Sequence, residues 1–505
     1  MKSTIHPPHR KQGKFESALH GENTDRAMLV EIAYRAMAER ELEREFPKEA
    51  LQQLASIHIT DGEIKNLRDM RDRPWASIDN DDSRDIDQLT CAESLDDGCI
   101  RILVAVADVD AWVSKNSAID DHAACNTASV YTPAVIFPML PLPLSNDLSS
   151  LNENVDRIAV VTDMVFDAAG SFVASDHYRA NVRNHAKLAY HSVGMWLASE
   201  GPIPEQILKV VGLESNLRLQ DLIAQRLASL REHHGALNLV VLEPKVIFNG
   251  DAISALEPND KNRATQLIED FMIAANGANA TYLAAKNFPL IRRILKSPER
   301  WDRIVKLALE MGEELPLVPD AVALETFLVR RRKVAPETFT DLSLAVVKLI
   351  GRGEYALVMP GDEAPGHFAL AVRNYTHSTA PNRRFPDLIT QRLLKAAMTD
   401  APAPYTIFEL EELAKHCTDR EEGITKVERR MRKSAAALLL SDRIGQSFEA
   451  VVTGASENGT WVRLLQPPVE GRLEHGFQGL DVGDSVNVKL VHTDTERGFI
   501  DFVRD

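Results

Sequence analysis

The chain has 505 residues, of which 44% are hydrophobic, so it is long enough for about two to four domains with sizeable cores. No apolar run approaches the roughly 18 residues of a membrane span, and the basic, polar residues 1–14 do not resemble a secretory signal. The four cysteines form no C-x-x-C pair, which argues against a zinc knuckle and favours a reducing compartment, the cytoplasm. The net charge of −16 argues against a simple electrostatic binder of nucleic acid.

The first 74 residues predict a tail followed by short helices. Apolar residues at helical spacing favour an amphipathic helix over residues 25–45, and Pro47 opens a second helix that extends to Leu54. We therefore expect a small helical N-terminal region over residues 1–74.

Residues 75–443 combine strands with long helices. Two β-rich runs, residues 100–107 and 158–166, are predicted strands, and residues 167–170 carry a hairpin turn signal. Helical periodicity then predicts long helices over residues 204–232, 262–285, 298–312, 342–350, 385–397 and 406–441. Strands followed by helices indicate one large α+β domain.

Residues 444–505 have the pattern of a small all-β barrel. Short strands are predicted at residues 448–453, 460–464, 471–473, 485–490 and 498–502, with glycines between them. Strands at this spacing fit an OB-like barrel. Trp461, Phe448 and Arg463 lie on these strands, as aromatic and basic residues do in OB faces that bind RNA, so we expect them to contact RNA.

The most informative segment is an acidic cluster that contains Asp79, Asp81, Asp82, Asp85 and Asp87. Mutual repulsion makes this density of carboxylates costly when they are brought together. A Ca²⁺ loop fits poorly, because no glycine follows the acidic pattern and no glutamate closes it. Apolar residues interleave with the aspartates, which places the cluster beside a core and argues against a solvated acidic loop.

Clustered aspartates are the residue type that metal-assisted phosphodiester hydrolysis needs. Two hard cations about 3.5–4 Å apart can hold the attacking and leaving oxygens of the displacement. Mg²⁺ takes few carboxylates and keeps positions for water and phosphate. The cluster alone therefore indicates a metal site and does not identify the substrate.

Local basic runs could carry contacts to a nucleic acid in spite of the acidic total. They are Arg292-Arg293 with Lys296, residues 330–333, Arg383-Arg384 and residues 426–433. For any single run, a solvated helix face is the favoured interpretation. Arg383 and Arg384 could also simply cap the helix that begins near Phe385.

Several motifs, in order, resemble those of the RNB exoribonucleases, the family of ribonuclease II and ribonuclease R. Asp79 with Asp85 and Asp87 resembles the family's D-x5-D-x-D-D motif. The blocks that follow are residues 107–109, 129–133, 138–141, 144–151, 235–237, 268–276, 366–371 and 375–387. The resemblance covers residues 75–505 and implies an RNB catalytic domain over residues 75–443 and an S1-type OB domain over residues 444–505.

The resemblance also implies a catalytic site. Asp79, Asp85 and Asp87 would hold Mg²⁺, or alternatively Mn²⁺, together with the attacking water, and Asp87 would be the most critical. Arg383 or Arg384 would contact the scissile phosphate and stabilise the charge that develops on it.

Two further residues would contact RNA. Tyr131, which by itself would be taken for an ordinary core or surface tyrosine, would stack on a base near the RNA 3′ end. Glu269 would lie beside the 3′-terminal ribose. Stacking tolerates any base, which suits an enzyme that degrades RNA processively.

The sequence departs from the family pattern in three places. Gln88 stands where the family has a fourth aspartate, and its neutral amide is a weaker Mg²⁺ ligand; Asp81 or Asp82 could compensate. Ser149 stands where the family has a cysteine. The family's two cold-shock OB domains are absent, and the helical residues 1–74 stand in their place, which leaves the preference for structured RNA open.

The expected function is hydrolysis of single-stranded RNA from its 3′ end to nucleoside 5′-monophosphates, by a monomer with no DNA or membrane partner. The alternative is a catalytically inactive RNB protein that binds RNA or a regulatory partner, and Gln88 is its only support. Three retained aspartates and two arginines favour the enzyme. A protein–protein scaffold would leave the acidic cluster and the paired arginines unexplained.

Overall fold

The structure is a computed structural model that describes residues 24–60, 64, 67–240, 244–258, 261–336, 338–456, 459–480 and 482–505. Within these ranges, the large domain is built on a seven-stranded sheet of order β1-β8-β7-β4-β3-β2-β9. The strands are β1 (Arg68–Asp69), β2 (Ala76–Asp79), β3 (Gln88–Ser94), β4 (Ile100–Ala107), β7 (Asp156–Phe166), β8 (Phe172–Arg183) and β9 (Ala186–Ala189). The pairs β1–β8 and β2–β9 are parallel, and the other pairs are antiparallel.

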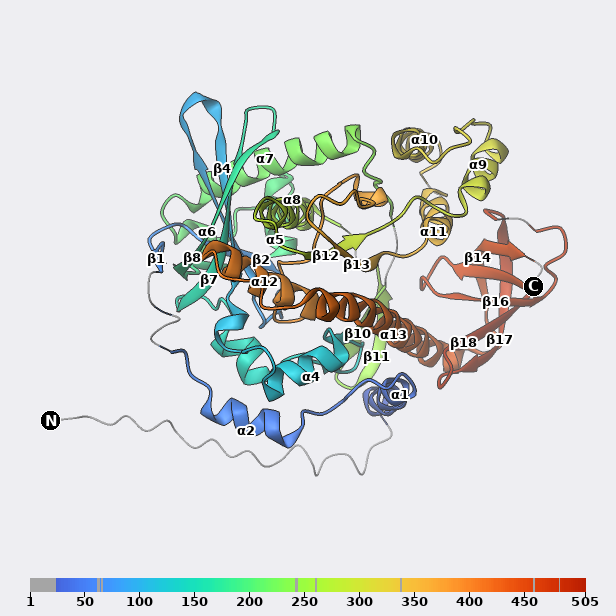
Figure 1. The fold of residues 1–505 in the computed structure, drawn as a ribbon. Coiled ribbons are helices and arrows are strands. Elements are labelled where there is room, and N and C mark those ends of the chain that lie inside the picture. The colour runs from blue at the N-terminus through green and yellow to red at the C-terminus, as the bar shows by residue number, and fades with distance from the viewer. Residues whose placement is uncertain are drawn as a thin grey trace.

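Helices cover both faces of this sheet (Figure 1). One face packs on α5 (Tyr190–Leu197), α6 (Glu205–Leu208), α7 (Leu213–His233) and α8 (Arg263–Ala285). The opposite face packs on α2 (Lys48–Ser56), α4 (Ala118–Asn126), α12 (Phe385–Met398) and the first part of α13 (Ile407–Leu440). Because both faces are covered, the central strand β4 is buried along nearly its whole length and is almost continuously apolar.

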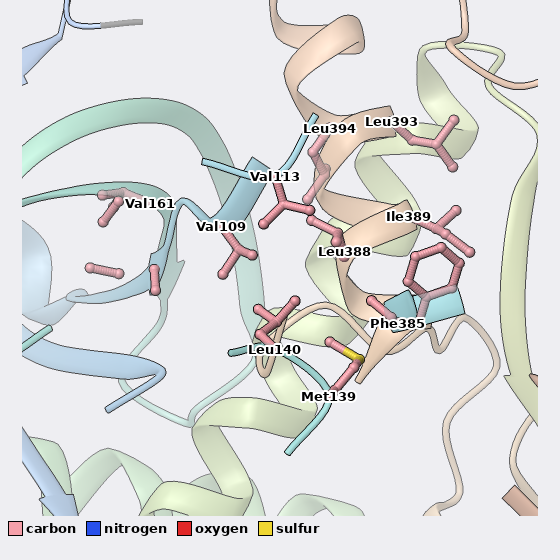
Figure 2. Packing of buried hydrophobic residues seen from close by; sticks show 14 of the residues in the cluster. Val109, Val113, Met139, Leu140, Val161, Phe385, Leu388, Ile389, Leu393 and Leu394 are labelled. Carbon is pink, nitrogen blue, oxygen red and sulfur yellow. The ribbon is translucent and has the colours of Figure 1, made fainter. Parts of the chain in front are cut away.

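Apolar contacts fix the start of α12 beside the end of β4. Figure 2 shows Leu388 and Leu394 of α12 turned toward Val109 and Val113, which directly follow β4. Phe385, the first residue of α12, belongs to the same buried cluster. The residues just before α12 are therefore held next to the segment between β2 and β3, where the aspartates lie.

Smaller elements surround the second half of α13. The hairpins β5 (Val130–Tyr131) with β6 (Ile136–Phe137) and β10 (Lys245–Asn249) with β11 (Ala252–Glu257) pack there, together with α1 (Asp25–Glu39). The remaining elements are the pair β12 (Leu290–Ile294) with β13 (Glu354–Val358), and α9 (Trp301–Glu310), α10 (Ala321–Val334) and α11 (Phe339–Ile350).

The C-terminal segment forms a closed barrel of five strands in the described residues, of order β14-β15-β16-β18-β17. They are β14 (Ser447–Ser456), β15 (Gly459–Leu464), β16 (Glu470–His475), β17 (Ser485–Asp494) and β18 (Phe499–Arg504). Ala437 and Leu440, at the end of α13, are buried in the same apolar cluster as the barrel interior. The helix therefore joins the barrel through its core and not through a loose linker.

The predicted α+β domain with a C-terminal barrel is confirmed, and the predicted strand over residues 100–107 has the observed bounds. The prediction of one long helix over residues 204–232 is wrong, because Gly212, with a φ of 79°, separates α6 from α7. The predicted helix over residues 25–45 ends earlier, at Glu39, and Glu41 then adopts a left-handed φ of 54°. The predicted tail lies outside the described residues. None of the described helices has the length and apolarity that crossing a bilayer requires.

Candidate active site

Asp87 is a buried carboxylate at the centre of the acidic cluster. Only 2% of its surface is exposed. Its oxygens accept hydrogen bonds from the backbone N–H of Asn382 and from Nε of Arg383, each at 3.1 Å. Burial raises the pKa of Asp87 to about 7; Arg383 opposes this shift and Asp85 adds to it. A carboxylate that is this buried and only partly neutralised favours a cation beside it.

Asp85 lies close enough to interact with both Asp87 and Asp79. Asp79 ends β2 and accepts a hydrogen bond from the backbone N–H of Asn80 at 2.7 Å. Burial raises the pKa of Asp79, Asp85 raises it further, and Arg383 lowers it. Asp85 thus repels both other carboxylates, and one arginine faces them.

This set of oxygen donors fits a hard divalent cation, because carboxylate oxygens are the ligands that Mg²⁺ prefers. In the described part of the chain, however, no three His, Cys, Asp or Glu side chains are already gathered closely enough to hold a metal ion. Asp85 repels the other two aspartates, so a cation would be needed to bring the three carboxylates together.

The backbone that carries the aspartates is fixed from two sides. Lys187 of β9 donates from Nζ to the carbonyl oxygen of Ser83 at 2.5 Å. The hydroxyl of Ser150 accepts from the backbone N–H of Ile86 at 2.9 Å and donates to the carbonyl of Arg84. Sequence reasoning missed the role of both residues, because each acts on backbone groups far away in the sequence; Lys187 belongs to no motif, and Ser150 lies in the block 144–151 without any signal of this contact.

A cavity of about 610 Å³ opens beside the aspartates. Its lining includes Asp82, Asp85, Tyr131, Lys245 and Arg432. The side of the loop that carries Asp81 faces a separate cavity of about 230 Å³ next to Lys187. Gln88 begins β3 and lines neither cavity.

Tyr131 presents its ring to the larger cavity. It is 40% exposed, and its hydroxyl donates to Asp85 at 3.4 Å. Its backbone N–H donates to Glu428 of α13 at 2.9 Å, which fixes the hairpin that carries it. The structure therefore brings Tyr131 to the aspartates, in a place where an apolar ring can receive a base.

Arg383 and Arg384 have different surroundings. The Arg383 side chain is 44% exposed, and it contacts Asp87 through Nε, so its terminal nitrogens remain accessible. Arg384 is 27% exposed and donates to the fully buried Asp387 at 2.7 Å. Of the two arginines, Arg383 is the one placed for contact with a phosphate, and Arg384 supports the start of α12.

Tyr190 is a site residue that sequence reasoning missed. It is the first residue of α5, which directly follows β9, the neighbour of β2. Burial raises the pKa of Tyr190, the charge of Asp79 raises it further, and Arg383 lowers it. The phenol therefore lies near Asp79 and Arg383. Tyr190 directly follows β9, the strand that pairs with β2, and this position could have indicated that it lies near Asp79.

Glu269 of α8 lies apart from the cavity of Asp85 and Tyr131. It lines another cavity, of about 410 Å³, and pairs with Lys261 at 2.7 Å on the surface. Its place beside a 3′-terminal ribose stays a prediction.

Phe448 and Arg463, two of the three barrel residues expected to bind RNA, lie in positions that do not suit contact with RNA. Phe448 is 8% exposed and packs inside the barrel, so its ring is not available to a base. Arg463 pairs with Asp341 of α11 at 3.0 Å and is 14% exposed, so its charge joins the barrel to the large domain. Strand alternation explains both positions, because Phe448 faces inward and Arg463 faces outward against α11.

Trp461 is placed differently. It lies on the outer side of β15, pairs across the strands with Gly454 and Arg472, and is partly exposed. A Cβ at Gly454 would stand 3.5 Å from the ring, an ordinary van der Waals contact, so the ring lies over this position of β14. Trp461 and the neighbouring Arg472 therefore form a surface on which a base can stack.

We expect Trp461→Ala and Phe448→Ala to have different effects. Loss of one stacked base costs about 1–3 kcal/mol of RNA binding, so Trp461→Ala should weaken the dissociation constant for RNA and leave the melting temperature close to that of the parent. Phe448→Ala should leave a cavity and cost roughly 3–5 kcal/mol of stability. Fluorescence anisotropy and thermal melting of both variants measure this. Equal RNA affinity of Trp461→Ala and parent would contradict the assignment.

Comparison with known proteins agrees with this architecture. The family model of the RNB domain matches residues 67–400, and that of the RNase II-type exonuclease C-terminal S1 domain matches residues 446–505. Ribonuclease R of Vibrio parahaemolyticus is 29% identical over 97% of this chain and 62% of its own length. Ribonuclease R of Escherichia coli is 29% identical over 91% of this chain and 57% of its own length. The chain thus spans about three fifths of the length of these curated relatives.

Solved structures share the fold. The apo form of Mycoplasma genitalium RNase R has a TM-score of 0.85 at 22% identity, covering 96% of this chain and 79% of that one. Yeast Ssd1, a pseudonuclease, has a TM-score of 0.71 at 15% identity, covering 95% of this chain and 58% of that one. At these identities the likeness shows the fold alone. Together with the match over residues 67–400, it shows that the chain belongs to the RNB-domain family.

Proposed function

We propose that this chain is a metal-dependent exoribonuclease that hydrolyses single-stranded RNA from its 3′ end to nucleoside 5′-monophosphates. The observation that carries the proposal is the buried Asp87, paired with the half-exposed Arg383 and close to Asp85, which also interacts with Asp79. The direction and the product rest on membership of the RNB-domain family and on relatives named Ribonuclease R. Mycoplasma genitalium RNase R, which shares the fold, has been solved in complex with ribose methylated single-stranded RNA.

The residues divide the reaction between them. Tyr131 would stack on a base and orient the strand in the cavity. Asp79, Asp85 and Asp87 would hold Mg²⁺, or Mn²⁺, which supplies an activated water and polarises the scissile phosphate. Arg383 would donate hydrogen bonds to the phosphate and stabilise the charge that develops on its oxygens, while it opposes the rise in the pKa of Asp87 that burial causes. Arg384 donates to Asp387, and Asp387 accepts from the backbone N–H of Ala380, which fixes the segment just before Arg383.

We also propose that the enzyme acts in the cytoplasm, as a monomer, on RNA and not on DNA. The cysteines Cys91, Cys99, Cys125 and Cys417 are all free, which suits a reducing compartment.

Incubation with 5′-labelled single-stranded RNA, with Mg²⁺ or with EDTA, tests the proposed function. We expect a ladder that shortens from the 3′ end with Mg²⁺ and intact RNA with EDTA. RNA that is bound in both conditions and cut in neither would instead support the inactive RNA-binding protein, the alternative that the neutral Gln88 suggests.

The raised pKa of Asp87 predicts how the metal requirement depends on pH. The folded protein holds a proton on Asp87 up to about pH 7, and this proton must leave before the carboxylate can bind a cation. The Mg²⁺ concentration for half-maximal activity should therefore rise as the pH falls from about 8 to about 6, approaching tenfold per pH unit. Mg²⁺ titrations at several pH values measure this, and a constant requirement would contradict it.

The same shift has a consequence for stability without metal. Because the folded state holds the Asp87 proton more tightly than the unfolded chain, Asp87 contributes stability that grows as the pH falls from about 7 toward about 4 and is lost as the pH rises through 7. Asp87→Asn should remove this contribution, which melting curves at several pH values would detect.

Variants of the acidic loop identify a fourth ligand. Asp82 lines the same cavity as Asp85, whereas Asp81 faces the other cavity. We expect Asp82→Asn to raise the Mg²⁺ concentration for half-maximal activity severalfold, and Asp81→Asn to resemble the parent. Gln88→Asp should not lower it, because Asp82 already supplies the charge. A lower Mg²⁺ requirement in Gln88→Asp would instead assign the fourth position to Gln88.

A further inference from the structure

A basic cavity lies on the outer side of α13, away from the aspartates. It has a volume of about 370 Å³ and is bounded by α1, α13 and the turn between β17 and β18. Six of the nine lining residues are basic and one is acidic; the basic ones are Arg40, Lys426, Arg429, Arg430, Lys433 and Arg497. In a chain of net charge −16, this concentration of positive charge needs an explanation.

Internal ion pairs neutralise only part of this charge. Arg430 pairs with Glu39 and Glu496, and Lys426 pairs with Glu422. Over the part of the chain that the structure describes, Arg40, Arg429 and Lys433 have no carboxylate within ion-pair distance. The unpaired cations therefore share one cavity, where they repel one another.

Lys433 is the least solvated of the three. Its stem packs so closely on the β17–β18 turn that a side chain at Gly498 would stand 2.6 Å from the Lys433 Cβ. Burial lowers the pKa of Lys433, the neighbouring Arg429 lowers it further, and Glu470 opposes the shift. An anion in the cavity would offset both the desolvation and the repulsion.

Basic residues of α13 line both this cavity and the cavity at the active site. Arg432, one residue before Lys433 on α13, lines the cavity of Asp85 and Tyr131 together with Lys245. Successive residues of a helix point about 100° apart. Arg432 and Lys433 therefore place positive charge in two neighbouring cavities on different sides of α13. The active-site cavity has the size of a site for one small molecule, so a longer RNA must run outside it.

We propose that this cavity, lined by Arg40, Arg429 and Lys433, binds backbone phosphates of the RNA segment on the 5′ side of the nucleotides held at the active site. Arginine and lysine are the side chains that bind phosphate, and a phosphodiester backbone presents one charge per nucleotide. The proposal rests on the proposed function for the identity of the polyanion. It explains why the basic run of α13 is not only a solvated helix face.

The test compares two RNA probes in EDTA, so that neither is cut. One is an unstructured oligouridylate of about 30 nucleotides, and the other has roughly five, enough for the active-site cavity only. The variant is Arg40→Gln/Arg429→Gln/Lys433→Gln. The matched control is Lys209→Gln/Arg303→Gln/Lys306→Gln, which removes the same charge at exposed positions on α6, α9 and their flanks.

The variant should bind the long probe roughly tenfold more weakly than the parent does, and the short probe equally well. The slope of log affinity against log salt for the long probe should become shallower by about 0.7 for each lost phosphate contact. The control should resemble the parent. Unchanged affinity and slope for the long probe, or an equal loss with the short probe, would overturn the proposal.

Additional measurements distinguish a loss of RNA contacts from misfolding and from binding of free phosphate. Because Lys433 is partly buried, Arg40→Gln/Arg429→Gln alone should give about two thirds of the slope change if the triple variant folds poorly. Inorganic phosphate at matched ionic strength should not displace the long probe; displacement would make free phosphate the ligand and overturn the assignment to RNA. Cleavage of the short probe with Mg²⁺ tests the proposed function separately, and these variants should retain it.

Discussion

Asp87→Asn should lower turnover by several orders of magnitude while RNA binding persists. Asn keeps the shape of the side chain and can still accept from the Asn382 N–H, but it lacks the charge that attracts a cation and holds Arg383. The loss falls on the transition state, so it should appear in kcat and leave KM nearly unchanged. Single-turnover cleavage of labelled RNA, with anisotropy for binding, measures both.

The fold should not account for this loss. The buried carboxylate with a raised pKa is costly in the metal-free protein, so Asp87→Asn should melt at the same temperature as the parent or slightly higher at pH 8. Asp147→Asn is a suitable control, because Asp147 is 72% exposed and pairs with Arg157 on the surface. Activity of Asp87→Asn equal to that of the parent would reject the assigned site.

Arg383→Ala should mainly lose activity, whereas Arg384→Ala should mainly lose stability. Removing Arg383 takes away a donor to the reacting phosphate, and losses of this kind amount to about 10²–10³ in kcat. It also removes the group that lowers the pKa of Asp87, so the remaining activity should need a more alkaline pH. Stability should fall less than in Arg384→Ala, because Asp87 already has a pKa raised to about 7 and can take up a proton once its partner Arg383 is removed.

Removing Arg384 leaves the carboxylate of Asp387 buried without its partner, which costs about 3 kcal/mol or more when such a pair is broken. Arg384→Ala should therefore melt at a lower temperature, and its activity at low temperature should exceed that of Arg383→Ala. Melting curves and pH–rate profiles of the two variants separate these roles. The opposite pattern, with Arg384→Ala stable and inactive, would place Arg384 on the phosphate.

The parts of the site that the sequence predicted are local in the chain or carried by a family motif. Asp79, Asp85 and Asp87 are close in the sequence, and both their density and the apolar residues around them were visible there. The contact of Asp87 with Arg383 joins positions 296 residues apart, so only the family resemblance could suggest it. Residue type alone could not separate Arg383 from Arg384, because the difference lies in Asp387, which α12 buries.

Other features depend on packing that no local pattern reports. Lys187 donates to the carbonyl of Ser83, a backbone group 104 residues away, and any lysine on a strand has the same sequence signal. Phe448 was predictable, because Phe448, Ala450 and Val452 alternate as the inward-facing residues of a strand. Arg463 was not, since its partner Asp341 belongs to a helix of the other domain.

The continuous helix α13 connects the barrel to the hairpin that carries Tyr131 at the active site. It has 34 residues, which corresponds to a length of about 51 Å. Glu428 holds the backbone of Tyr131 near the middle of the helix, and Leu440 is anchored in the barrel interior at its end. A ligand of the barrel that tilts this helix would change the free energy of a strand stacked on Tyr131. By linkage, the strand would then change the affinity of the barrel for that ligand by the same factor.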